Sequence, residues 1–266
     1  MDPFPRSPDP DEGPPVHGGL PSGSDPPALS QAEPGFFARC VALFTAPRNA
    51  FRAPRGLTFW LIPLIVILAV TVVDSVLLGD LYNEQIIETI ESNRSFSDEQ
   101  RTLILDTLEA KNESGTTVSS ILQTTVGAIV NEALAFFLLG LFYMFGVNFG
   151  LAGQARYLDV VGVLALSWMA LVPRVLLTLP LKLSQGTLDI HTGPAALVSH
   201  QGGWLPTILG FFDLFDLFRL FLITVGLSVV GGVKTSRSVI LVVAFWLLGC
   251  GFQIAWKMGP FGGMTP

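Results

Sequence analysis

The chain has 266 residues, of which 50% are hydrophobic and 14% charged, and its mean hydropathy is +0.56. A soluble domain carries about a quarter charged residues, and a net charge of −6 provides no basic surface for nucleic acid. The composition therefore excludes an ordinary soluble domain and a nucleic-acid-binding protein. The apolar residues lie in long runs separated by charged stretches, a pattern typical of an all-α, polytopic membrane protein.

Residues 1–34 hold ten of the nineteen prolines, together with glycine, serine and scattered acids. Such a segment buries too little apolar surface to offset its ordering entropy, so it predicts a disordered cytoplasmic tail. A tail that binds a polyproline-reading partner is the alternative. A secretory signal peptide is excluded, because the first long apolar run begins only near residue 57.

Residues 35–55 predict a short lead to the membrane domain. Phe37, Val41 and Phe44 recur at helical spacing beside Arg39, which indicates an amphipathic helix at the membrane surface. Pro47 is well placed as the first residue of a second helix. Four arginines predict a basic face toward anionic headgroups, or alternatively toward a specific partner: Arg39, Arg48, Arg52 and Arg55.

Five apolar runs predict five transmembrane helices within one domain, residues 35–260. At 1.5 Å per residue the first run is about 33 Å long, enough for a hydrocarbon core of about 30 Å. The third run is the least regular, because it contains Pro173 and Arg174. The predicted spans are residues 57–78, 121–146, 160–180, 211–230 and 239–256.

The loop between the first two spans, residues 79–117, predicts two short helices in an acidic segment. The second helix opens with Ser97-Asp98-Glu99-Gln100, a capping-box pattern in which Ser97 and Gln100 satisfy each other's free amides. We expect this helical loop to be external.

The lysines and arginines near the span ends predict the orientation. One side of the membrane holds Arg6, Arg39, Arg48, Arg52, Arg55, Arg156, Lys234 and Arg237. The other side holds Arg94, Arg101, Lys111, Lys182 and Lys257. The N-terminus is therefore predicted to be cytoplasmic, and an odd number of spans places the C-terminus outside.

The lead and the spans resemble a known family. The segment LFTAPRNAF, Trp60 and Pro63 early in the first span, the phenylalanine-rich fourth span with Gly226, and Trp246 in the last span carry the resemblance. Over residues 35–256 the chain resembles the Yip domain family, five-span proteins named for interaction with Ypt/Rab GTPases, in its bacterial branch. The Asp-Leu-Tyr-Gly motif of the eukaryotic members is missing. The resemblance therefore implies a fold and a location, the bacterial inner membrane, rather than a Rab-binding role.

Charges inside a bilayer are costly, so each one is a candidate for function. Counted at about 1.5 Å per residue, all of them fall in the outer half or near the midplane, and Glu132 is deepest at about 18 Å. We infer a shared pocket in which Arg174 pairs with Asp213 or Asp216, and Asp216 pairs with Arg219. An excess of acids would suit a cation or a proton. The predicted pocket comprises Asp74, Glu132, Arg174, Asp213, Asp216 and Arg219.

Structural roles are the alternative for these side chains. Asp213 and Asp216 occupy the first turn of a span, where the helix dipole favours carboxylates, and Asp74 and Arg174 are near enough to the interface to reach it. Glu132 needs a partner, a wet cavity or a neutral form. Separately, Gly146 and Gly150 form a GxxxG pattern that permits close helix packing, although the pair could simply mark the exit turn.

No pattern of catalytic or metal-binding residues occurs in the chain. The histidines are His17, His191 and His200, and all three lie outside the predicted spans. The spans therefore contain no histidine that could bind a metal or act as the base for a nucleophile. We therefore expect no enzyme, no cofactor and no metal. The leading hypothesis is a membrane scaffold or adaptor that contacts lipids or a membrane or cytosolic protein. The alternative is a transporter, channel or lipid-moving protein built around the charged pocket.

Overall fold

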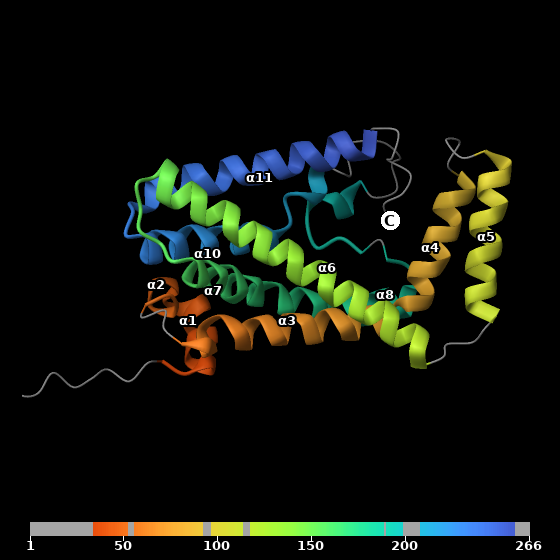
Figure 1. Cartoon of the computed structure of the whole chain (residues 1–266), viewed down its shortest axis with the longest axis horizontal. Coiled ribbons are helices and arrows are strands. Elements are labelled where there is room, and N and C mark those ends of the chain that lie inside the picture. Colours follow the sequence, from red (N-terminus) through yellow and green to blue (C-terminus); the bar gives the residue numbers. More distant parts are fainter. Residues whose placement is uncertain are drawn as a thin grey trace, which may run out of the picture. The chain divides into compact units, whose positions relative to one another are not determined.

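The structure is a computed structural model that describes residues 34–52, 56–92, 97–113, 118–188, 190–198 and 208–258. The predicted tail and Arg55 lie outside these residues. Every regular element in the described ranges is helical, and five helical segments are long and apolar enough to cross a membrane. The predicted all-α polytopic bundle is therefore confirmed (Figure 1).

Two short helices lead into the five spans. The lead comprises α1 (Phe36–Thr45) and α2 (Pro47–Ala50), and α4 (Gly79–Ser92) and α5 (Asp98–Glu113) follow the first span. The spans are built from α3 (Leu57–Leu77), α6 (Val118–Phe145) with a π-helical turn (Gly146–Gly150), α7 (Tyr157–Trp168) with α8 (Val172–Gln185), α10 (Leu214–Gly231) and α11 (Thr235–Met258). A 3-10 segment, Met169–Leu171, joins α7 to α8, and another, Pro194–Leu197, lies before α10.

The second span belongs to a helix that is longer than the bilayer is thick. The 28-residue α6 and the five-residue π-helical turn together measure about 50 Å, longer than a hydrocarbon core of about 30 Å. The predicted span, residues 121–146, lies within this helix, and the segment Ile129–Gly150 is long and apolar enough to cross a membrane.

Helix α7 forms the centre of the bundle, where it packs against α3, α6 and α10. Its residues from Val160 to Ser167 are all buried. Glycines make the two closest approaches. A methyl group on Gly162 would lie 2.2 Å from the Phe59 ring of α3, and one on Gly226 of α10 would lie 2.4 Å from Val163. Close helix contact of this kind replaces the hydrophobic driving force that is missing inside a membrane.

We expect Gly162→Ala to lower the free energy of unfolding by about 3 kcal/mol, the upper end of the usual cost of overpacking. The added methyl group overlaps the buried Phe59 ring, which is itself only 2% exposed and cannot move aside freely. Gly127→Ala is the matched control, because no atom lies within 4 Å of its added methyl group and alanine favours the helix. Titration of the detergent-purified protein with SDS measures both; equal stabilities would contradict the proposed α3–α7 contact.

The lead helix α1 has its polar residue turned inward and its apolar face turned outward. Arg39 is only 4% exposed, and its guanidinium donates hydrogen bonds to the carbonyl oxygens of Ala50 (2.7 Å) and Arg52 (3.0 Å). It also lies over the Phe59 ring, 5.0 Å from its centroid. The prediction that Arg39 belongs to a surface basic face is therefore wrong, because its guanidinium N–H groups donate inward to carbonyl oxygens at the end of α2. Arg48 and Arg52 are exposed, as predicted.

The predicted amphipathic helix itself is present as α1. Phe37, Val41 and Phe44 are 82%, 63% and 56% exposed, and Phe44 also stacks on Phe218 of α10 at 5.4 Å. The exposed apolar side chains share one face at helical spacing, whereas Leu43 is buried against the bundle. The first helix therefore has one face on the protein and one face free for lipid.

The exit of the second span is organised by Asn148 in the π-helical turn. Its side chain donates to the carbonyl oxygen of Ala155 (2.9 Å) and accepts from the amide of Ala155 (2.8 Å), which fixes the connection to α7. Gly146 admits α11, since an added methyl group would lie 2.7 Å from Leu241, whereas Gly150 has no atom within 4 Å. Gly146 thus serves packing within the chain, and dimerisation through the pair stays a prediction.

The loop between the first two spans forms the two predicted helices. The capping box at the start of α5 is confirmed: the Ser97 amide donates to Gln100 Oε1 at 3.1 Å, and the Gln100 amide donates to Ser97 Oγ at 3.2 Å.

Candidate functional site

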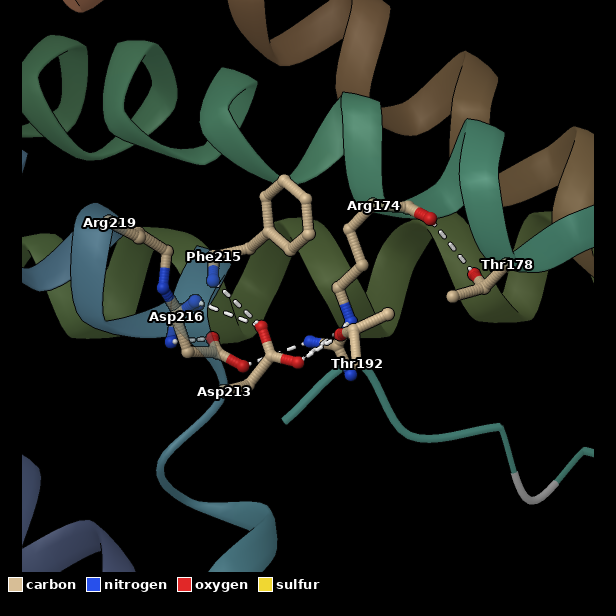
Figure 2. Close-up of polar contacts among 7 residues, drawn as sticks. All are labelled: Arg174, Thr178, Thr192, Asp213, Phe215, Asp216 and Arg219. Atoms are coloured by element: carbon tan, nitrogen blue, oxygen red, sulfur yellow. Dashed lines mark hydrogen bonds and ion pairs between the residues drawn. The ribbon is translucent and has the colours of Figure 1, made fainter. Parts of the chain in front are cut away.

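Charged side chains from α8 and α10 meet inside the bundle and form the candidate site. Arg174 Nη1 lies 2.9 Å from one carboxylate oxygen of Asp216, and Arg219 Nη2 lies 3.0 Å from the other. Both expected pairings are therefore present, and a single carboxylate is shared by two guanidinium groups (Figure 2). The three side chains are 34%, 23% and 22% exposed for Arg174, Asp216 and Arg219, so the group is only partly accessible.

Asp213, the residue just before the first turn of α10, supports this group. It is 3% exposed and caps the helix, accepting hydrogen bonds from the amides of Phe215 (2.8 Å) and Asp216 (3.4 Å). Its other oxygen accepts a hydrogen bond from Thr192 and lies 4.0 Å from Arg174 Nε. The helix dipole and these donors stabilise its negative charge. Asp213 therefore anchors the start of α10 and orients Arg174.

The break in the third span brings Arg174 to α10. The chain leaves α-helical geometry at Met169–Leu171 and starts again at Val172, with Pro173 in the first turn of α8. Proline has no amide hydrogen to donate, so the first turn of a helix tolerates it. Arg174 follows directly, and its side chain crosses to Asp216 (Figure 2).

Trp168, the last residue of α7, supports Arg219. The guanidinium carbon of Arg219 lies 5.2 Å from the Trp168 ring centroid, and the Trp168 ring meets Phe136 edge-on at 5.5 Å. Arg219 Nε and Trp168 Nε1 are buried and, within the described residues, have no hydrogen-bond acceptor. Two buried donors thus lie beside the shared carboxylate with unused hydrogen-bonding capacity.

The charged group lies in the wall of a cavity of about 640 Å³. Its walls come from α6, from the α7–α8 connection, from α10 and α11, and from the segment that carries His191. Polar and charged side chains share the lining with leucine, isoleucine, phenylalanine and tryptophan. The lining residues include Leu139, Tyr143, Trp168, Arg174, Asp216, Arg219, Leu220, Ile223, Phe245, Trp246, Gly249 and Gln253.

Asp74 does not take part in this group. It accepts a hydrogen bond from the Tyr82 hydroxyl at 3.3 Å, which joins the end of α3 to α4. Burial raises the pKa of the Tyr82 phenol above its ordinary value, and the Asp74 carboxylate raises it further. The phenol therefore stays protonated at neutral pH and keeps donating this hydrogen bond.

Glu132 is also separate from the group. It does not line the cavity, and within the described residues it forms no hydrogen bond or ion pair. Glu132 is partly exposed, and its depth in the bilayer and its role stay predictions.

The site therefore differs in charge from the one expected. The structure gathers two arginines and two aspartates, Arg174, Arg219, Asp213 and Asp216, rather than four acids and two arginines. The formal charge of the group is zero instead of negative, which removes the basis for a cation or proton site. Sequence reasoning missed Trp168 and Thr192, because neither residue belongs to a motif and their positions depend on how the chain returns between α8 and α10.

Within the ranges that the structure describes, no three histidine, cysteine, aspartate or glutamate side chains gather closely enough to hold a metal ion. No curated protein and no solved structure matches the chain. The model of the Yip1 domain family matches residues 41–256, from the second half of α1 to the last turns of α11, and therefore includes part of the lead and all five spans. Placement in the bacterial branch stays a prediction. The chain belongs to the Yip1 domain family.

Proposed function

We propose that the protein is a non-enzymatic membrane scaffold or adaptor whose working surface is the basic end of the bundle. The observation that carries this proposal is the lead α1–α2, which Arg39 fixes against α3 and which presents an apolar face to lipid. A helix held in this way has a defined position relative to the spans and adds a fixed surface at the membrane boundary.

Exposed basic side chains gather at the same end as the lead. The amide of Gln154 donates to the carbonyl oxygen of Gly231 at 3.2 Å, which joins the 151–156 connection to the end of α10. Phe51, at the end of α2, lies against Gly226 of α10. The exposed basic residues at this end are Arg48, Arg52, Arg156, Lys234 and Arg237. Their charge supports a cytoplasmic position for this end, a cytoplasmic N-terminus and an external C-terminus, and it suits anionic headgroups or an acidic partner.

Site-specific photocrosslinking in native membranes tests the adaptor role. A photoreactive residue placed at Asn49, which is exposed between the two arginines of α2, is expected to give one dominant protein adduct. Arg48→Glu with Arg52→Glu is expected to remove that adduct by reversing the local charge. Lys182→Glu, on α8 at the opposite end, is the matched control and is expected to keep it. Adducts that do not respond to the charge reversal would contradict the proposal.

The cavity favours a second candidate function, a transporter, channel or lipid-moving protein. A volume of about 640 Å³ with charged and apolar walls is within the range of ligand-binding sites. Flux of ions or of labelled lipid through liposomes containing the purified protein distinguishes the two functions. Clear flux by the wild-type protein, absent from empty liposomes, would favour transport over the adaptor.

A further inference from the structure

The cavity beside Arg219 lies where the second and fifth spans separate. At one end α6 and α11 are in contact: the rings of Tyr143 and Phe245 meet at 5.2 Å, and Gly146 admits Leu241. Figure 1 shows the two helices diverging from that contact toward the C-terminal end of α11. The cavity lies along this divergence, with Leu139 from α6 and Gly249 from α11 in its walls.

The charges that line the cavity favour an anion. Arg174, Arg219 and Asp216 face it, whereas Asp213 is not part of the lining and is engaged by Thr192 and by the amides of α10. Among the lining side chains, two guanidinium groups therefore stand against one carboxylate; the charge that makes the four-residue group neutral belongs to Asp213, whose Oδ2 lies 4.0 Å from Arg174 Nε but outside the lining. Each guanidinium has five N–H donors, and Asp216 uses only one from each at close range. The remaining donors suit the oxygens of a monoanion.

The apolar part of the lining shows which kind of anion fits. Leu220, Ile223 and Phe245 line the cavity together with the arginines, so its occupant has apolar as well as charged groups. Leu247 and Leu248 on α11 and Phe142 on α6 are 56%, 67% and 61% exposed, which places hydrocarbon on both sides of the divergence. Arg219 is five residues beyond the start of α10, only about 8 Å along the helix. A phosphate near the interface can therefore reach it.

We propose that this cavity binds the phosphodiester headgroup of a glycerophospholipid. Arg174 and Arg219 hold the phosphate, and the acyl chains leave between α6 and α11 into the bilayer. A phosphodiester carries the single negative charge that the lining lacks. Its oxygens are also acceptors for the buried donors Arg219 Nε and Trp168 Nε1 after a small shift of the Arg219 side chain. This binding site does not depend on the adaptor role proposed above.

Gly249→Leu tests the site by filling the cavity without changing a charge. Gly249 lines the cavity and has no atom within 4 Å of an added methyl group, so a leucine there occupies the space of the headgroup. Gly251→Leu is the matched control: it lies on the same helix, has equally open surroundings and does not line the cavity. Arg219→Met removes one phosphate contact and leaves Asp216 paired with Arg174.

Binding is measured on the full-length protein in detergent by native mass spectrometry, with dioleoylphosphatidylethanolamine as the probe. We expect one tightly held lipid on the wild-type protein and on Gly251→Leu. We expect the affinity of Arg219→Met for the lipid to fall by about tenfold to a hundredfold, the usual effect of losing one hydrogen bond to a charged group. We expect Gly249→Leu to lose lipid binding.

Two further probes identify what the cavity recognises. Dioleoylglycerol, which has the chains but no phosphate, is expected not to bind, and sodium phosphate is expected neither to bind nor to displace the phospholipid. Equal retention of dioleoylglycerol, displacement by inorganic phosphate, or unchanged lipid binding by Gly249→Leu would each overturn the proposal.

Discussion

Asp216→Asn is expected to lower the free energy of unfolding by about 3 kcal/mol, because it removes the charge that two partly buried arginines share. The asparagine keeps the shape of the side chain and one acceptor, so the change isolates the charge. Of the carboxylates in the described residues, Arg174 then keeps Asp213, at 4.0 Å, and Arg219 keeps none, although it still lies over the face of Trp168. The partial exposure of the group places the expected cost at the lower end of the range for breaking a buried ion pair.

Asp98→Asn is the matched control for this prediction. Asp98 and Arg101 form an ion pair with the same spacing and order along the chain as Asp216 and Arg219, at 3.4 Å, but the Asp98 side chain is 99% exposed. An exposed pair contributes about 0–1 kcal/mol. Unfolding by SDS in mixed micelles compares the two variants. The double variant Asp216→Asn/Arg219→Met should recover part of the loss by removing the unpaired charge; no recovery, or equal losses at positions 98 and 216, would refute the prediction.

Arg39→Met is expected to release the lead helix from the bundle. The substitution keeps a long apolar side chain but removes the charged donor from the carbonyl oxygens of Ala50 and Arg52. At about 1.5–3 kcal/mol for each hydrogen bond to a charged group, the local free energy that holds α1–α2 falls by about 3 kcal/mol or more. The population in which α1 is detached should therefore rise on the order of a hundredfold.

Cys40, the next residue of α1, provides the local measurement. Burial raises the pKa of its thiol above the ordinary value, so little thiolate is present at neutral pH in the docked helix. In a Cys250→Ser background a polar maleimide should label Cys40 much faster after Arg39→Met. Arg48→Met is the matched control, since Arg48 is an exposed arginine of the same lead and its loss leaves both carbonyls paired. Equal labelling rates in the two variants would show that Arg39 does not hold the helix.

Much of the architecture follows from local sequence patterns. Apolar length alone indicated five spans, and local chemistry indicated Pro47 in the first turn of α2, the Ser97–Gln100 capping box and the position of Asp213 at the start of a span. Each of these depends on residues within a few positions of one another. The i,i+3 pair of Asp216 and Arg219 belongs to the same class.

The residues that were misplaced are those whose surroundings come from distant parts of the chain. The amphipathic pattern around Arg39 is the same whether its polar face meets water or protein. The carbonyl oxygens that accept its hydrogen bonds lie eleven and thirteen residues away. Glu132 does not join the charged group because α6 lines the cavity with residues further along the helix, Leu139 and Tyr143.

The sequence by itself determined the membrane class, the number of apolar helices and the local helix signals, because these depend on hydrophobicity and short-range hydrogen bonds. Only the tertiary structure decided which apolar faces meet protein and which meet lipid, since hydrocarbon and a packed leucine are equally apolar surroundings. It also decided that Arg174, Asp216 and Arg219 share one cavity while Asp74 and Glu132 do not. The break between α7 and α8 and the return of the chain to α10 bring those three together.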